Sequence, residues 1–145
     1  MASISRSALL PYSAARIYAI VDDIAAYPQF MQGCVATEVL QRNAESVTAT
    51  LVLGKAGFRH SVTTRNLLQP PERMLMTLLE GPFKKFEAIW QFQVLSENAC
   101  KVSFDMHFEF KAGLVDKVLG SLFESTGSEM VNAIAKRAQQ LYGRA

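Results

Sequence analysis

The amino-acid sequence predicts an α+β fold in which a curved antiparallel sheet wraps around a long C-terminal helix. Between residues 35 and 110, apolar and polar residues alternate along most of the chain, which is typical of strands with one buried face. After Gly113 the apolar residues recur every three or four positions, the spacing of an amphipathic helix. A sheet with one apolar face needs such a cover, and 145 residues suffice for one domain of this kind, covering residues 1–145.

The N-terminal part is predicted to contain a strand, a helix and a compact loop. Residues 3–10 form the predicted strand, and Ser13 is well placed to cap the helix that follows it. Pro28 lacks an N–H donor, so we expect it to end this helix before a loop over residues 27–34. The helical spacing depends on four apolar residues, Ile17, Ile20, Val21 and Ile24.

Six further strands are predicted from the apolar runs and the turn residues between them. Glycine, proline and asparagine separate these runs at hairpin spacing, so a meander is the simplest topology. The last strand is the clearest, because every apolar residue from Cys100 to Phe110 falls at an even position. The predicted strands cover residues 35–42, 46–53, 58–67, 73–80, 84–95 and 100–110.

The last predicted element is a helix that ends at Gly143, a residue type that commonly follows a helix C-terminus. About 28 residues at 1.5 Å each give roughly 40 Å, enough to cross the whole sheet. Gly120 and Gly127 lie within this helix, where each glycine costs about 1 kcal/mol relative to alanine. Either the helix kinks or approaches the sheet at these glycines, or the missing side chains leave room for a ligand.

Large aromatic side chains are predicted to line an apolar cavity between the sheet and this helix. They alternate along the last two strands and face Phe123 and Met130 of the helix. Flat rings leave irregular gaps that a hydrophobic ligand can fill, and the alternative is an ordinary aromatic core. The loop over residues 27–34 is expected to form part of the entrance. The candidate ligand-binding residues are Tyr27, Phe30, Met31, Phe58, Phe83, Phe86, Trp90, Phe104, Phe108, Phe110, Leu119, Phe123, Gly127 and Met130.

A cluster of cations is predicted at one end of the sheet, because every second turn of a meander lies at the same end. Glu80 and Asp116 are the acidic residues expected there. An apolar opening surrounded by cations suits contact with an anionic membrane surface or an RNA backbone. The alternative is a set of lysines that are simply solvated. The candidate residues of this cationic rim are Lys55, Arg59, Lys84, Lys85, Lys111 and Lys117.

Composition excludes several classes of function. The net charge of +2 is too small for a nucleic-acid footprint by itself, and DNA is not an expected partner. Cys34 and Cys100 show no disulfide or metal spacing, which favours a reducing compartment. No apolar run reaches the roughly 20 residues that span a bilayer. We therefore expect a cytoplasmic protein. Any association with a membrane is expected to be peripheral, at the inner membrane surface.

Catalytic and metal sites are not predicted. The sequence contains no phosphate-binding loop, nucleophile elbow, zinc-protease motif or paired-cysteine motif. Asp105, His107 and Glu109 share one strand face, but neighbours there lie about 6.6 Å apart and point away from the apolar side. His60 is the one ionisable candidate for the cavity. We therefore predict no catalytic residue, no metal ligand and no required cofactor.

Three stretches of the sequence together resemble a known family. They are Tyr27–Cys34, Gly81–Phe92, and Phe108–Phe110 followed by a helix that ends in Arg137–Gly143. In order and spacing, these stretches are similar to the coenzyme Q-binding branch of the START-like, polyketide cyclase/dehydrase superfamily. The resemblance covers nearly the whole chain. It implies a helix-grip fold, as in START-like and Bet v 1-like proteins, in agreement with the strands and helices predicted above.

The same resemblance implies a function. It implies noncatalytic binding of an isoprenoid quinone, such as ubiquinone, in support of respiratory electron transport. Lys55–Gly57 and Thr63–Asn66 are most similar to the ribosome association toxins of this branch, which implies binding to the large ribosomal subunit and inhibition of translation initiation as the alternative. Polyketide cyclase or aromatase activity is the less favoured alternative. Gln32 departs from the family pattern, in which proline is expected at this position.

Overall fold

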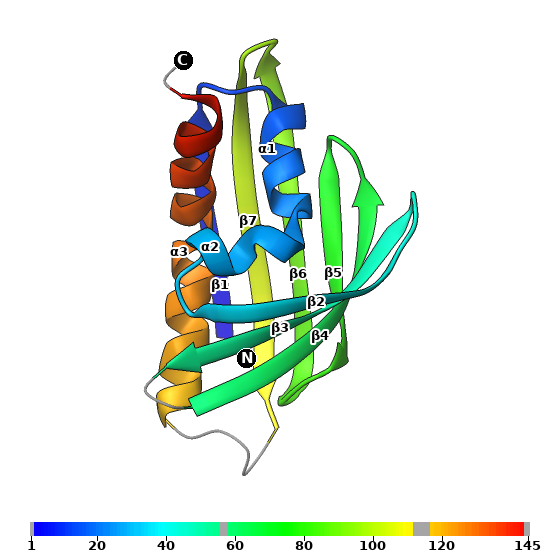
Figure 1. The fold of residues 1–145 in the computed structure, drawn as a ribbon, viewed down its shortest axis with the longest axis vertical. Coiled ribbons are helices and arrows are strands. Elements are labelled where there is room, and N and C mark those ends of the chain that lie inside the picture. The colour runs from blue at the N-terminus through cyan, green and yellow to red at the C-terminus, as the bar shows by residue number, and fades with distance from the viewer. Residues whose placement is uncertain (1, 56–57, 112–116, 144–145) are drawn as a thin grey trace.

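The structure is a computed structural model that describes residues 2–55, 58–111 and 117–143. One antiparallel sheet of seven strands curves around a long C-terminal helix, α3 (Lys117–Tyr142), as Figure 1 shows. This architecture confirms the predicted α+β class. The strands are β1 (Ala2–Leu10), β2 (Cys34–Arg42), β3 (Ser46–Lys55), β4 (Phe58–Gln69), β5 (Arg73–Glu80), β6 (Phe83–Ser96) and β7 (Ala99–Phe110).

The sheet is the predicted meander with the first strand added at one edge. The strand order is β1-β7-β6-β5-β4-β3-β2, so β2 to β7 follow one another in sequence and β1 pairs with β7. Its register keeps the apolar residues on one face. Met74 lies opposite Trp90, and Trp90 lies opposite Phe104 on the next strand, so inward side chains line up in rows.

Bulges interrupt the register where the strands bend. One lies between Phe83 and Lys85, where β6 has one residue more than its partner β7. The inserted residue, Lys84, breaks the alternation, and both Lys84 and Lys85 are exposed. Other shifts occur in β2, between β4 and β5, and near the end of β6. These irregularities help a long sheet to curve around one helix.

The N-terminal helices differ from the prediction at Pro28. Helix α1 (Ala14–Asp22) starts as predicted, because the Ser13 side chain accepts a hydrogen bond from the Arg16 N–H at 3.2 Å. It ends at Asp22, and a short 3-10 helix, η1 (Ile24–Ala26), follows. Pro28 does not end a helix but lies in the first turn of α2 (Tyr27–Phe30), where no intrahelical N–H donor is needed. The expected compact loop is therefore partly helical.

Helix α3 spans 26 residues and ends as predicted. Gly143 has a φ of 73°, a left-handed conformation that glycine adopts without strain, and its N–H donates to the Gln139 carbonyl at 2.9 Å. Tyr12 donates a hydrogen bond to the Gly143 carbonyl at 2.6 Å, which fixes the helix end against the start of α1. The residues expected to open the helix, 112–116, lie outside the described residues.

Candidate functional site

A small cavity lies between the concave face of the sheet and α3. Its volume is about 50 Å³, and its wall is almost entirely apolar. Strands β3, β4, β5, β6 and β7 and helix α3 all contribute residues to its wall. Met31, just after α2, completes the wall. The lining residues are Met31, Leu51, Leu53, Val62, Thr64, Met76, Phe86, Phe104, Met106, Phe123, Thr126, Gly127 and Met130.

The surroundings of Gly127 bear on both explanations offered for this glycine of the helix. A methyl group at this position would lie 2.7 Å from the Met106 Cε atom and 3.0 Å from the Ile4 Cδ1 atom. The missing side chain therefore lets α3 approach β1 and β7 closely. Gly127 also lines the cavity, so the same position leaves open space beside the close contact. Both effects operate at one residue.

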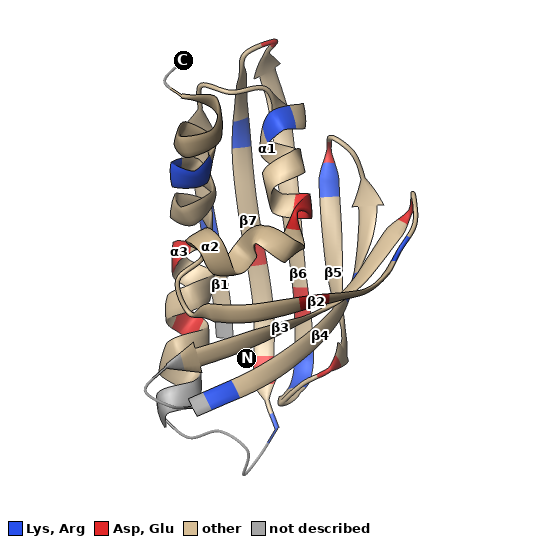
Figure 2. Cartoon of the chain, viewed as in Figure 1, with Lys and Arg blue, Asp and Glu red and all other residues tan. Residues whose placement is uncertain are grey.

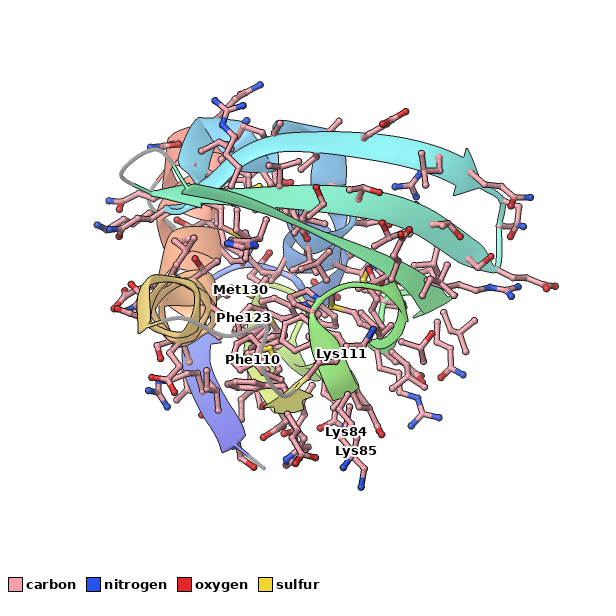
Figure 3. The ribbon with its side chains drawn as sticks, turned by 90° about the horizontal axis from the view of Figure 1, so that it is seen from below. Lys84, Lys85, Phe110, Lys111, Phe123 and Met130 are labelled. Carbon is pink, nitrogen blue, oxygen red and sulfur yellow. The ribbon has the colours of Figure 1, made fainter. Side chains whose placement is uncertain are left out.

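The aromatic side chains are packed more tightly than the sequence predicts. Phe83 contacts Phe123 with ring centroids 4.7 Å apart and stacks on Phe110 at 4.9 Å. Phe108 meets Phe123 edge to face at 4.8 Å, and Figure 3 shows Phe110 and Phe123 close together beside α3. Such distances are typical of well-packed aromatic pairs. This cluster, formed by Phe83, Phe86, Phe108, Phe110 and Phe123, fills its part of the interior.

The candidate ligand-binding residues therefore occupy different places. Tyr27, Phe30, Phe83, Trp90, Phe108 and Phe110 lie outside the cavity wall, and the side chains of Phe58 and Leu119 lie outside the described part of the structure. Trp90 is fully buried and packs on the back of the cavity residue Phe104, with ring centroids 4.6 Å apart. The candidates that line the cavity are Met31, Phe86, Phe104, Phe123, Gly127 and Met130.

Several wall residues were not among the candidates. Leu51 and Leu53 of β3, Val62 of β4 and Met76 of β5 all point inward by the same alternation that identified the last two strands. For β3 this alternation is visible in the sequence, because the apolar residues Val47, Ala49, Leu51 and Leu53 all fall at odd positions. Thr126 gave no signal, since a threonine on a helix face is commonly solvated. The additional wall residues are Leu51, Leu53, Val62, Thr64, Met76, Met106 and Thr126.

The two polar side chains that line the cavity, those of Thr64 and Thr126, are engaged with the protein. Thr64 donates to the Asn66 side-chain oxygen at 2.9 Å, and both residues are buried. Thr126 donates to the Gln32 carbonyl at 3.3 Å. Among the described lining residues, none has an ionisable side chain. His60 is half-buried and does not line the cavity. The site offers an apolar surface and no group suited to moving a proton.

The segment before β2 closes one side of the cavity and is held firmly. Tyr27 donates a hydrogen bond to the Val21 carbonyl, and burial strongly raises the pKa of this buried phenol. Arg137 of α3 lies over the Phe30 ring at 5.2 Å and donates to the Gln29 side-chain oxygen at 3.2 Å. Tyr27 and Phe30, both candidates, therefore anchor the segment that carries Met31 into the cavity wall.

The expected cationic rim lies partly on the outside of the sheet. Lys111 and the turn before β6 share one end, since the Lys111 N–H donates to the Pro82 carbonyl at 3.0 Å. Figure 3 shows Lys84 and Lys85 extending away from Phe123 and Met130. Figure 2 shows basic residues at both ends of the molecule, with acidic residues among them. Arg59, Lys84, Lys85 and Lys111 are exposed, and the side chains of Lys55 and Lys117 lie outside the described residues.

The convex face carries hydrogen-bonded polar pairs. Ser5 donates to an Asp105 oxygen at 2.5 Å, and Ser3 shares a hydrogen bond with the His107 Nδ1 atom at 2.8 Å. In the part of the chain that the structure describes, no three histidine, cysteine or acidic side chains are placed to hold a metal ion. None of the helices, over the same residues, is long and apolar enough to cross a membrane.

Comparison with known proteins identifies full-length relatives. The ribosome association toxin RatA of Escherichia coli K12 is 40% identical, and the match covers 98% of this chain and 90% of RatA. The mitochondrial coenzyme Q-binding protein COQ10 of Drosophila melanogaster is 26% identical, with 96% of this chain and 59% of COQ10 covered. The first of these relatives is similar enough to establish common family membership.

Solved structures agree with the fold. The Zhui aromatase/cyclase of Streptomyces sp. R1128 matches with a TM-score of 0.84 at 15% identity, covering 96% of this chain and 94% of that one. A START superfamily protein of Mycobacterium smegmatis matches with a TM-score of 0.77 at 23% identity, covering 96% and 98%. The family model for polyketide cyclase/dehydrase and lipid transport matches residues 10–135. The chain therefore belongs to the polyketide cyclase/dehydrase and lipid transport family, and to the same family as RatA.

Proposed function

We propose that the protein binds a hydrophobic ligand noncatalytically, with the apolar chain of the ligand held between the sheet and α3. The observation that supports this most directly is the cavity beside Gly127, whose wall is almost entirely apolar. Burial of apolar surface contributes roughly 25 cal/mol per Å², so even a short hydrocarbon chain gains affinity there. An aromatase or cyclase reaction is less favoured, because proton transfer needs ionisable groups near the substrate.

The ligand must enlarge the cavity as it enters. The volume of about 50 Å³ is well below the roughly 150 Å³ of an apolar cavity that accepts benzene. Four methionines, at positions 31, 76, 106 and 130, line the wall. Methionine has several rotatable bonds and adapts its shape to irregular partners. We propose that these side chains withdraw from the space that the ligand chain occupies.

An isoprenoid quinone of the ubiquinone type is the ligand that we propose. The relative named for binding coenzyme Q supports this class, and an isoprenoid chain suits a wall without charges. The biological role would be to carry or present quinone for respiration. Such a carrier would exchange its ligand at the inner membrane surface.

The test uses protein purified without detergent. Organic extraction followed by mass spectrometry should yield a quinone or another isoprenoid lipid in near-stoichiometric amount. Added short-chain quinone should raise the melting temperature of stripped protein, since a ligand that binds only the folded state stabilises it. Absence of any extracted lipid together with an unchanged melting temperature would rule the proposal out.

A second candidate function is association with the large ribosomal subunit. The similarity to RatA over 98% of the chain favours it, and the exposed cations at the start of β6 offer a surface for RNA phosphates. The surface carries acidic residues as well. Lys85 lies opposite Glu109, whose negative charge partly compensates the positive charge of Lys85. Lys84 is therefore the stronger candidate for phosphate contact. This function would be separate in space from the lipid cavity.

Cosedimentation with dissociated ribosomal subunits tests the second function. Binding should weaken as salt rises, because phosphate contacts release counterions. The double variant Lys84→Glu with Lys85→Glu should bind much more weakly than wild type. A control with the same change in net charge, Lys101→Glu with Lys136→Glu, should bind like the unmodified protein. Equal losses of ribosome binding in the two variants would show that only overall charge matters. If wild-type protein leaves the association of the ribosomal subunits unchanged, the function is refuted.

A further inference from the structure

A second hollow lies next to the apolar cavity and differs from it in chemistry. Its volume is about 130 Å³. It opens between the segment before β2, the end of β3 and the first half of α3. Polar groups contribute much of its wall, and Gln32 and Ser125 are exposed there. We call this hollow the polar cleft. It is lined by Gln32, Gly33, Gly54, Leu122, Ser125 and Thr126.

The polar cleft and the cavity share a wall. Thr126 lines both of them. Three pairs of consecutive residues are divided between the two spaces. Met31, Leu53 and Phe123 line the cavity, and their chain neighbours Gln32, Gly54 and Leu122 line the cleft. The hydrogen bond from the Thr126 hydroxyl to the Gln32 carbonyl, at 3.3 Å, crosses the boundary. Only a thin layer of side chains therefore separates the two spaces.

The backbone at this boundary is fixed by Gly33. Its φ of 87° is left-handed, and its carbonyl accepts a hydrogen bond from the Gly54 N–H at 2.9 Å. A β-carbon on Gly33 would collide with the Thr126 side-chain oxygen. Because Gly33 has no side chain, the loop can lie directly against α3, and no side chain from this position occupies the cleft. Such a close approach is a site where only glycine fits.

We propose that the polar cleft binds the ring of the ligand while its apolar chain passes beside Thr126 into the cavity. This inference rests on the proposed lipid binding and adds a site for the polar end. The volume of about 130 Å³ is close to the roughly 150 Å³ that accepts a benzene ring. The Gln32 amide and the Ser125 hydroxyl can both donate and accept hydrogen bonds. The cleft thus fits a six-membered ring that carries carbonyl or hydroxyl oxygens.

Two ligands and two matched variants test this arrangement. Decylubiquinone has both ring and chain, whereas 1-decanol has a chain of the same length without a ring. Ser125→Phe fills the polar cleft from an exposed position and leaves the cavity wall intact. Ser121→Phe adds the same ring one helical turn earlier, at an exposed residue outside both hollows. Melting temperatures with and without each ligand give the affinities.

In the expected result, Ser125→Phe weakens decylubiquinone binding at least tenfold and leaves 1-decanol binding unchanged, while Ser121→Phe changes neither. Gln32→Ala, which removes only the amide, should weaken decylubiquinone binding by a smaller factor. An equal loss for both ligands, or no loss for decylubiquinone, overturns the assignment of the cleft while the proposed lipid binding stands. Failure of both ligands to stabilise wild-type protein overturns the proposed function, and the cleft assignment with it.

Discussion

The interior of this protein contains two neighbouring regions that are built differently. The aromatic cluster around Phe83 and Phe123 is filled by its own rings, whose centroids approach to 4.7 Å. The cavity beside Gly127 adjoins this cluster and shares Phe86 and Phe123 with it, but the rest of its wall is mainly methionine and aliphatic side chains. The comparison teaches that large rings fill space here, and that space remains where flexible side chains meet a glycine.

The physical reason lies in the shape and stiffness of the side chains. Aromatic rings have two side-chain torsions and broad complementary faces, so a set of them can pack edge to face without gaps. Methionine packs acceptably in many conformations, so its neighbours do not force one arrangement. A rigid region next to an adaptable one lets the fold remain stable while the adaptable region changes shape.

The largest expected effect is in the rigid region. Phe108→Ala removes a ring that is 1% exposed and contacts Phe83 and Phe123, so it leaves a cavity that its stiff neighbours cannot close. We expect the free energy of unfolding to fall by about 3–5 kcal/mol. Urea denaturation followed by the fluorescence of Trp90 measures it. A loss of about 1 kcal/mol or less would show that this cluster is as adaptable as the cavity.

A smaller effect is expected in the adaptable region. In Gly127→Ala the new methyl group meets the ends of the Met106 and Ile4 side chains, which can move aside, and the helix gains about 1 kcal/mol of intrinsic propensity. We expect the free energy of unfolding to change by no more than about 1 kcal/mol in either direction. Ligand binding should weaken, because the methyl group and the displaced Met106 occupy the cavity. Strong destabilisation instead would mean that the wall is rigid.

At neutral pH the smallest expected effect concerns the thiol beside the segment that closes the cavity, because its contribution to stability changes only in alkaline solution. Burial raises the pKa of Cys34 from 9.0 to about 11. Between these pH values the unfolded chain has lost the thiol proton while the folded protein retains it, so the free energy of unfolding falls as pH rises. Denaturation at pH 8.5 to 11 should show a shallower decline for Cys34→Ala than for wild type. Identical slopes would place this thiol in contact with water.

Much of the fold could be predicted because alternation and turn chemistry are local signals. The face of each strand is set by whether its apolar residues fall at odd or even positions, and Gly143 ends α3 as its type suggests. Pro28 was misinterpreted, because proline cannot continue a helix but can begin one. The choice between those outcomes depends on the chain before it, where η1 turns the backbone after α1.

The position of the cavity could be predicted only in part. Gly127 was among the candidates because a missing side chain in a helix is visible in the sequence, and it lies in the cavity wall. Of the aromatic candidates, Phe86, Phe104 and Phe123 line the cavity and most of the others do not, because alternation shows that a ring faces inward and not what it meets there. The bulge at Lys84 also changes which residues of β6 share a face, and the sequence carries no clear sign of it. Thr126 and Gln32 meet across 94 positions of chain, a contact that no local pattern predicts.

The most direct test of lipid binding in the cavity uses the methionine methyl groups as reporters. Met31, Met76, Met106 and Met130 line the cavity, whereas Met74 is buried in the packed core outside it. In an NMR titration of methyl-labelled protein with decylubiquinone, the four cavity methyl signals should shift together and saturate, and the Met74 signal should stay in place. A titration that leaves the four cavity signals unmoved, or that moves Met74 as much as the others, would contradict a ligand between the sheet and α3.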